Sequence, residues 1–235
     1  TGATTSDFRV IAHVGHHSIR EAVELARHAA ECGADGISTM GPSFLKPSSV
    51  DALVEFCAPI AAAAPDLAFY YYHIPSLSGV DLPMIEFLAR AEKVIPNLAG
   101  IKFTHADLFD FQRCRTYQDG RFDILWGIDE ALLGALAVGA VGAVGSTYNY
   151  AAPIYLQMIS AFERGDIQTA RNCSRGAVRL VEVLHQFGVL AAGKALMSLH
   201  GVACGSPRPP LLQLSTDEQA QLLAQVEALE LISKG

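Results

Sequence analysis

Short apolar runs rich in β-forming residues alternate with longer helical patterns along nearly the whole chain. Six such runs are found, at Arg9–Val14, Gly36–Met40, Ala68–His73, Ala99–Phe103, Phe122–Gly127 and Ala140–Ser146. Successive runs are separated by roughly 20 to 35 residues, the distance that a strand and a crossover helix need together. Several runs lack polar alternation, as expected for strands of a parallel sheet that is covered on both faces. The pattern predicts a parallel α/β fold.

The segments between these runs carry helix start signals. Ser18 and Glu21 form a capping-box pattern for the first helix, and Ser48 or Ser49 is expected to begin the second. A last helix is expected to begin at Ser215, which again has a glutamate three residues later. Further helices are expected at residues 81–93, 107–118, 129–138, 153–164, 167–188 and 191–200.

No low-complexity linker and no break in composition divides the chain, so residues 1–235 are predicted to form a single domain. Residues 1–165 hold the expected strands with their helices, and residues 166–235 are expected to form a C-terminal helical extension. Six consecutive strand–helix units are typical either of a doubly wound sheet or of part of an eight-stranded parallel barrel. Periodicity leaves both architectures open.

Composition excludes several classes of function. Apolar residues make up 51% of the chain and charged residues only 17%, which is typical of a well-buried globular protein. The formal net charge of −7 argues against a nucleic-acid partner, because phosphate binding normally needs a basic face. No apolar run reaches the roughly 18 residues that a membrane span requires. No signal-peptide pattern is visible at the start of the sequence, so the cytoplasm is the expected location.

Neither the cysteines nor the histidines are spaced like metal ligands. The five cysteines are scattered without a C-x-x-C pair and are expected to be buried free thiols in a reducing compartment; they are Cys32, Cys57, Cys114, Cys173 and Cys204. His13, His16 and His17 lie beside a strand end, but no acidic residue has a suitable spacing to complete a site with them. We therefore predict no metal.

A lysine inside an apolar strand is the most informative residue of the chain. Lys102 lies between Ile101 and Phe103, and a buried cationic side chain is costly unless something uses or pairs it. Desolvation favours the neutral amine that attacks a carbonyl group. A lysine paired with a carboxylate, or one that faces solvent at the strand end, fits the same pattern. Tyr72 at the end of the preceding run favours the catalytic interpretation, because iminium chemistry needs a group that moves protons.

Four motifs follow one another along the chain: Y-Y-H-I-P-S-L-S-G-V at Tyr71–Val80, G-I-K-F-T at Gly100–Thr104, G-I-D-E at Gly127–Glu130 and G-A-V-G-S-T-Y-N at Gly142–Asn149. Together and in this order they resemble the N-acetylneuraminate lyase and dihydrodipicolinate synthase family of pyruvate-dependent aldolases. The resemblance implies a (β/α)8 TIM barrel, of which this chain supplies strands three to eight. The family's first two strands and their G-x-x-G-E loop have no counterpart before Val10, so both strands are expected to be absent from the chain.

Within that family the sequence is most similar to the lyase branch. Synthase relatives carry an arginine at the position of Leu77, which holds a second substrate carboxylate, and a relay tyrosine at the position of Phe44. Neither side chain here supplies those groups. Asp129, Glu130 and Ser146 match the lyase pattern, in which they bind the polyhydroxylated tail of the sugar.

The resemblance implies retro-aldol cleavage of sialic acid to N-acetylmannosamine and pyruvate, without a cofactor. Lys102 forms a Schiff base, Tyr72 handles the proton, and Thr104 orients the sugar, while Gly127 and Gly145 allow close approach of the backbone. A homotetramer is implied as well. Another 2-keto acid sugar aldolase of the same family, or a non-catalytic protein that binds sugar acids, fits the same residues less well.

Overall fold

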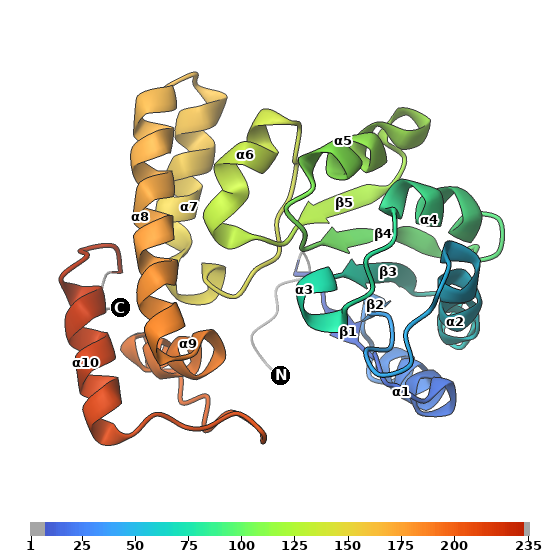
Figure 1. The fold of residues 1–235 in the computed structure, drawn as a ribbon, viewed down its shortest axis with the longest axis horizontal. Coiled ribbons are helices and arrows are strands. Elements are labelled where there is room, and N and C mark those ends of the chain that lie inside the picture. The colour runs from blue at the N-terminus through green and yellow to red at the C-terminus, as the bar shows by residue number, and fades with distance from the viewer. Residues whose placement is uncertain (1–7, 233–235) are drawn as a thin grey trace. The chain divides into compact units, whose positions relative to one another are not determined.

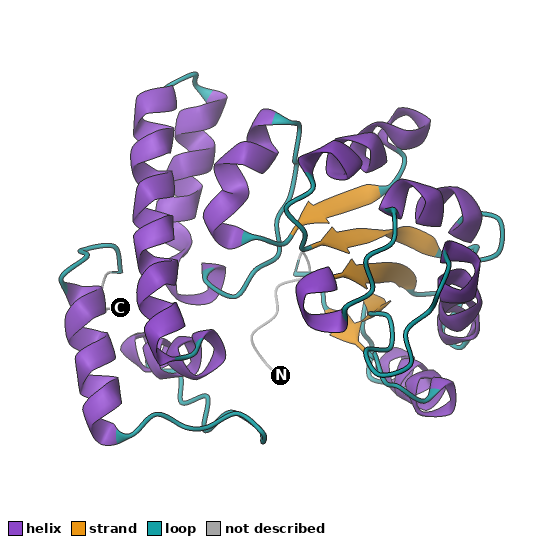
Figure 2. Ribbon diagram, viewed as in Figure 1, coloured by secondary structure: helices purple, strands orange, loops and turns teal. Residues whose placement is uncertain are grey.

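Five parallel strands form the sheet of the computed structural model, which describes residues 8–232 (Figures 1 and 2). The strands are β1 (Ile11–His13), β2 (Gly36–Thr39), β3 (Ala68–His73), β4 (Leu98–Phe103) and β5 (Asp123–Trp126). Their order in the sheet is the order in the sequence, and every neighbouring pair is parallel. A doubly wound sheet reverses its order at a switch point, whereas the wall of a barrel does not. The sheet therefore has the order of a barrel wall.

Helices cover one face of this sheet as a single layer (Figure 2). The layer consists of α1 (Ile19–Glu31), α2 (Val50–Ala62), α4 (Met84–Ala91) and α5 (Leu108–Thr116), and each helix packs beside the next. Side chains that alternate along β3 and β4 are buried beneath these helices. Tyr71 and Phe103 are fully buried in this way, whereas Tyr72 and Lys102 point to the opposite face and are only half-buried.

Capping side chains explain where these helices begin. Ser18 and Ser49 accept hydrogen bonds from the backbone amides three residues later and so begin α1 and α2, as predicted. The fourth helix begins at Met84 rather than at the predicted residue 81. Its amino end is held by Asp110 of α5, whose carboxylate accepts a hydrogen bond of 2.6 Å from the Met84 amide. A short helix that the sequence pattern did not predict, α3 (Pro75–Ser78), follows β3.

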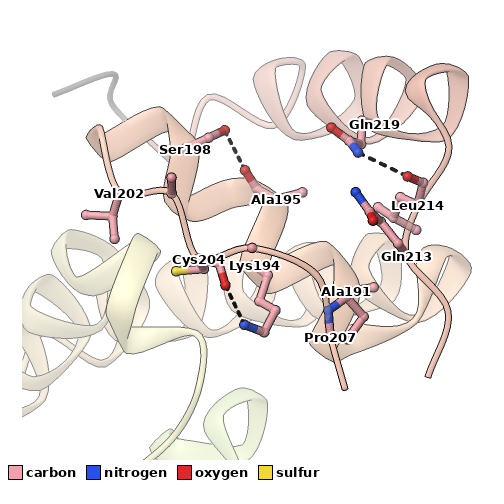
Figure 3. Close-up of a pocket in the computed structure, with 12 residues that line it drawn as sticks. Ala191, Lys194, Ala195, Ser198, Val202, Cys204, Pro207, Gln213, Leu214 and Gln219 are labelled. Atoms are coloured by element: carbon pink, nitrogen blue, oxygen red, sulfur yellow. Dashed lines mark hydrogen bonds between the residues drawn. The ribbon is translucent and has the colours of Figure 1, made fainter. Parts of the chain in front are cut away.

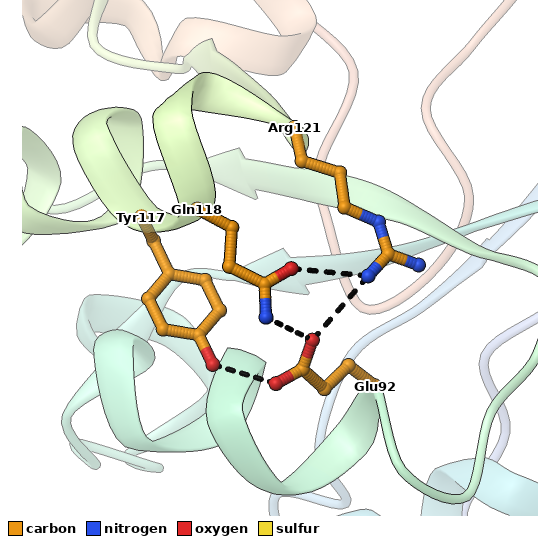
Figure 4. A network of polar contacts seen from close by, with 4 residues as sticks. All are labelled: Glu92, Tyr117, Gln118 and Arg121. Atoms are coloured by element: carbon orange, nitrogen blue, oxygen red, sulfur yellow. Dashed lines mark hydrogen bonds and ion pairs between the residues drawn. The ribbon is translucent and has the colours of Figure 1, made fainter.

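A turn with two left-handed non-glycine residues closes α5. Gln118 and Asp119 have φ angles of 48° and 57° within the 3₁₀ segment η1 (Tyr117–Gly120). Glu92 compensates for this strain, because its carboxylate accepts hydrogen bonds from the Tyr117 hydroxyl at 2.6 Å and the Gln118 amide at 2.7 Å (Figure 4). Arg121 also contacts Glu92, at 3.4 Å.

The described residues divide into two compact units. The first comprises the chain up to Gly127 together with Gly139–Gly142, and the second comprises Ile128–Val138 and the chain from Ala143 onwards. The second unit is helical and contains η2 (Asp129–Ala131), α6 (Leu132–Ala137), α7 (Tyr148–Glu163), α8 (Ile167–Phe187), α9 (Val189–Leu196), η3 (Met197–His200) and α10 (Thr216–Glu227). The expectation that residues 1–235 form one domain, divided near residue 165, stays a prediction.

Helix α8 and the segment that follows it are bent by 110° at Gly188. Within residues 8–232 no single helix is long and apolar enough to cross a membrane; this bent pair passes a test of length and composition only. At the carboxyl end of the chain, Ser215 and Glu218 form the predicted capping box and begin α10.

The predicted sixth strand, Ala140–Ser146, is wrong as a continuous strand. Only Ala143 makes an isolated bridge, and the Trp126 amide donates a hydrogen bond of 3.0 Å to the Gly142 carbonyl. Two glycines in this segment, Gly142 and Gly145, weaken it as a strand, and Gly139 just before it has a φ of 94°, outside the β region. The thiol prediction also needs correction: Cys57, Cys114 and Cys173 are buried, but Cys32 is exposed and Cys204 is half-buried.

Candidate active site

Tyr72 and Lys102 are direct partners across the β3–β4 ladder. The Lys102 Nζ lies 4.0 Å from the centroid of the Tyr72 ring, a cation–π distance. Both side chains lie on the face of the sheet that the helix layer leaves free. The parallel register therefore brings together the two residues that the sequence singled out for chemistry.

The tyrosines of β3 differ sharply in what their hydroxyl groups do. Tyr70 donates a hydrogen bond of 3.2 Å to Asp123 of β5, and burial and that carboxylate raise the pKa of Tyr70 to about 12. Tyr71 packs under the helices, with its ring centroid 4.7 Å from that of Phe87 in α4. Tyr72 forms no hydrogen bond with any described residue, so its hydroxyl is available to a ligand.

The amine of Lys102 is likewise available to a ligand. Its amine forms no hydrogen bond and no ion pair with residues 8–232. Lys194 of the second unit provides a contrast, because its Nζ donates a hydrogen bond of 2.8 Å to the Cys204 carbonyl in a cavity of about 190 Å³ (Figure 3). A lysine bound to a backbone carbonyl must give up that bond to attack a ketone, whereas Lys102 has no such bond to lose.

His13 and Ser38 extend the same face toward β1. The His13 Nδ1 lies 3.2 Å from the Ser38 hydroxyl, and the His13 ring meets the Tyr72 ring edge-on at 6.0 Å. Partial desolvation lowers the pKa of His13, and the positive charge of Lys102 lowers it further. A neutral imidazole thus lies beside Tyr72 at physiological pH.

Thr104 lies directly after β4 and packs against Gly127. The Thr104 hydroxyl is buried without a hydrogen-bond partner. A Cβ added at Gly127 would lie only 1.9 Å from that oxygen, so residue 127 must be glycine for the threonine to keep this position. An unpartnered buried hydroxyl is unusual in a folded protein and indicates a site for a polar ligand atom.

In the second unit, Asp129 is fixed by the chain around Thr147. Its Oδ2 accepts hydrogen bonds from the Thr147 amide at 2.8 Å and from the Thr147 hydroxyl at 2.6 Å. The Thr147 Oγ1 also lies within hydrogen-bonding distance, 2.7 Å, of the Tyr155 hydroxyl. Gly145 lies so close to the Asp129 carboxylate that any added Cβ would overlap it. Asp129, Gly145 and Thr147 therefore form one packed group.

The other predicted site residues of this part of the chain are more open to solvent. Glu130 is half-buried and Ser146 is exposed, and the Ser146 carbonyl accepts hydrogen bonds from the backbone and side-chain amides of Asn149. Leu77, on the short helix α3 of the first unit, has 75% of its surface exposed. The Leu77 side chain therefore packs little against the other described residues.

Comparisons with known proteins show the family of this chain. The sequence matches the dihydrodipicolinate synthetase family over residues 3–229. The chain belongs to this family. It is 45% identical to N-acetylneuraminate lyase A of Xenopus laevis over 227 residues, which cover 95% of this chain and 74% of the relative.

Solved structures of the family superpose closely on the chain. The N-acetylneuraminate lyase of Proteus mirabilis gives a TM-score of 0.94 at 45% identity, and the alignment covers 97% of this chain and 77% of that one. The sialic acid aldolase of Aliivibrio salmonicida also gives 0.94, at 47% identity, with 97% and 76% covered. The expected TIM-barrel class is thereby confirmed.

The sequence reasoning missed the roles of Thr147 and Ser38, and it considered His13 only as a metal ligand. Thr147 lies inside the motif that contains Ser146, and its hydroxyl was a visible signal for a partner of Asp129. Ser38 and His13 carry no such signal, because the contacts of Ser38 with His13 and of His13 with Tyr72 come from strands far apart in the sequence.

Proposed function

We propose that the protein is an N-acetylneuraminate lyase that cleaves sialic acid into N-acetylmannosamine and pyruvate through a Schiff base on Lys102. The uncommitted amine of Lys102 beside the uncommitted hydroxyl of Tyr72 is the observation that carries the proposal. The identities of 45–47% to lyases from three organisms support the choice of substrate.

The reaction begins when the Lys102 amine attacks the C2 ketone of open-chain sialic acid and water leaves. The protonated imine then draws electrons from the C3–C4 bond. Tyr72 assists removal of the C4 hydroxyl proton, the bond breaks, and N-acetylmannosamine leaves as the aldehyde. The enamine that remains is protonated at C3 and hydrolysed, which releases pyruvate and regenerates Lys102.

Proton transfer through Tyr72 needs a route by which its hydroxyl exchanges protons. A carboxylate that accepted a hydrogen bond from this hydroxyl would keep its proton away from the substrate, as Asp123 does for Tyr70. The free hydroxyl of Tyr72 can instead exchange directly with the substrate. This difference supports Tyr72, rather than Tyr70, as the proton-handling residue.

The sugar tail requires several polar partners. We assign Thr104 to this role because its buried hydroxyl has no partner among the described residues. Asp129, Glu130 and Ser146 follow the lyase pattern for binding sugar hydroxyls, and the close packing at Gly127 and Gly145 supports roles for their backbones near the ligand. The polar group at Thr147 would keep the Asp129 carboxylate in one orientation.

Release of pyruvate from a panel of sugar acids tests the proposal, with the purified protein compared with its Lys102→Arg variant. We expect lysine-dependent cleavage of N-acetylneuraminate. Faster cleavage of a different 2-keto sugar acid would select another aldolase of the family. Saturable binding of sialic acid without any pyruvate release would instead identify a non-catalytic binding protein.

Assembly as a homotetramer and a cytoplasmic location stay predictions from the family resemblance. Analytical ultracentrifugation of the purified protein tests the first, and fractionation of the source cells tests the second.

A further inference from the structure

A second cluster of chemically active side chains lies beside strands β3 and β4, on the face opposite to Tyr72 and Lys102. His73, Asp81 and His105 each offer one ligand atom, and these atoms all lie within 4.8 Å of one another. The three residues line a cavity of about 260 Å³ in the first unit. The other residues around this cavity are Leu82, Pro83, Asp107, Phe109, Asp110 and Arg113.

Strand alternation separates this cluster from the Schiff-base residues. Tyr72 and Thr104 point to the free face of the sheet, so the adjacent residues His73 and His105 point to the helix-covered face. The two imidazole rings meet edge-on, with centroids 5.4 Å apart. The ends of two neighbouring strands therefore bring both histidines to one place.

The environment of His73 is the main evidence that this cluster binds a ligand. Only 1% of its surface is exposed, and its Nδ1 has no hydrogen-bond partner. Buried polar atoms without a partner are rare, and an imidazole nitrogen is a preferred ligand of divalent transition metals.

The neighbouring charges leave Asp81 as the carboxylate available to such a metal. Asp107 accepts hydrogen bonds from two amides at the start of α5, and Asp110 accepts hydrogen bonds from the amides of Met84 and Ile85. Asp81 is exposed and forms no hydrogen bond or ion pair within residues 8–232. The Arg113 guanidinium stacks over the Phe109 ring, 5.3 Å from its centroid.

We propose that His73, Asp81 and His105 form a binding site for a divalent transition metal of the zinc type, with water as a further ligand. Two imidazoles and one carboxylate are a donor set that suits Zn²⁺. Two ligands of a tetrahedral zinc ion are separated by ~3.3 Å, given bonds of ~2.0–2.1 Å. The ligand atoms lie within 4.8 Å of one another, so rotation of the exposed Asp81 and the half-buried His105 toward the buried His73 would close the remaining gap.

Metal binding here would link three segments around the catalytic strands. Asp81 follows helix α3, whereas His73 and His105 adjoin Tyr72 and Thr104 in the sequence. The bound ion would hold these segments together on the helix-covered face of the sheet, without contact with the substrate. The site thus stabilises the fold and does not take part in the Schiff-base chemistry.

Isothermal titration of the metal-free protein with ZnCl₂ tests the site, with thermal unfolding measured alongside. We expect one saturable site and a higher melting temperature with zinc. His105→Asn and Asp81→Asn should each weaken zinc binding at least tenfold, since even changes behind a metal ligand cost roughly 10- to 100-fold. Neither residue is fully buried, so both variants should fold, which circular dichroism checks.

The matched control is the double variant His16→Gln/His17→Gln, which removes two exposed histidines from another part of the same unit. It should bind zinc as the unchanged protein does. Absence of saturable binding below millimolar zinc would overturn the proposal. Zinc affinity that falls in the control, or that is equal in the unchanged protein and both site variants, would overturn it as well.

Discussion

The amine of Lys102 lies 4.0 Å from the centre of the Tyr72 ring because the two residues are register partners on adjacent parallel strands. Neither functional group is bonded to another described side chain, whereas the hydroxyl of Tyr70, two residues earlier, is bonded to Asp123. An amine and a hydroxyl that are both free, close together and on one face are what imine chemistry with proton transfer requires.

Reduction with borohydride in the presence of pyruvate should attach the three-carbon unit to Lys102 and stop turnover irreversibly. The reason is that only a lysine whose amine is free to attack a ketone forms the imine that borohydride reduces. Peptide mapping by mass spectrometry locates the adduct. Lys194→Arg is the control and should be labelled normally, since its amine is bound to the Cys204 carbonyl. An adduct on Lys46, Lys93 or Lys194 would show that the mechanism is wrong.

Tyr72→Phe should lower kcat by roughly a hundredfold or more, because the ring remains while the proton-transferring hydroxyl is lost. Steady-state pyruvate release measures this effect. Tyr71→Phe is a matched control, since Tyr71 packs against Phe87 on the opposite face of the same strand. Its activity should be unchanged. Equal losses in both variants would mean that the hydroxyl of Tyr72 has no special role.

Thr147→Val should destabilise the protein by about 1–3 kcal/mol, because the buried Asp129 carboxylate loses a hydrogen-bond donor. Urea unfolding measures this change. If Asp129 binds the sugar tail, KM for sialic acid should also rise. Thr147→Ser keeps the hydroxyl and should restore KM. Loss of stability with an unchanged KM would assign the Thr147–Asp129 pair to folding alone.

Leu77→Arg should weaken cleavage of sialic acid and favour substrates with a second carboxylate, because a guanidinium group binds a planar anion through two hydrogen bonds. The exposed position of Leu77 makes the substitution compatible with folding. Competition between sialic acid and dicarboxylic 2-keto acids measures the change. Identical selectivity before and after the substitution would show that residue 77 does not contact the substrate.

Cys32 should react with a thiol reagent much faster than Cys57 in the folded protein. Cys32 is exposed, whereas Cys57 is fully buried, and burial raises the pKa of the Cys57 thiol and so disfavours the reactive thiolate. Time-resolved labelling followed by mass spectrometry measures both rates. Cys32→Ser should remove the fast phase. A fast phase that persists and labels Cys57 would mean that this buried thiol becomes accessible.

Local sequence patterns predicted most of the strands and helices of the first unit and the candidate catalytic lysine. Apolar runs at regular spacing predicted the five strands from Ile11 to Trp126, and serine caps predicted the starts of α1, α2 and α10. The unusual position of Lys102 between two apolar residues was visible in the sequence as well. Such features depend on residues close to one another in the chain, so a single sequence reveals them.

Other features depended on which distant segments meet, and only the tertiary structure decided them. The start of α4 at Met84 is set by Asp110, twenty-six residues away, and the segment at Ala140–Ser146 forms no continuous strand despite its apolar pattern. The cluster of His73, Asp81 and His105 was likewise invisible, since each residue is unremarkable in its own motif. Strand register and the alternation of side chains bring His73 and His105 to one face and place Tyr72 with Lys102 on the other, while the loop after α3 brings Asp81 to the two histidines. None of these relationships is local in the sequence.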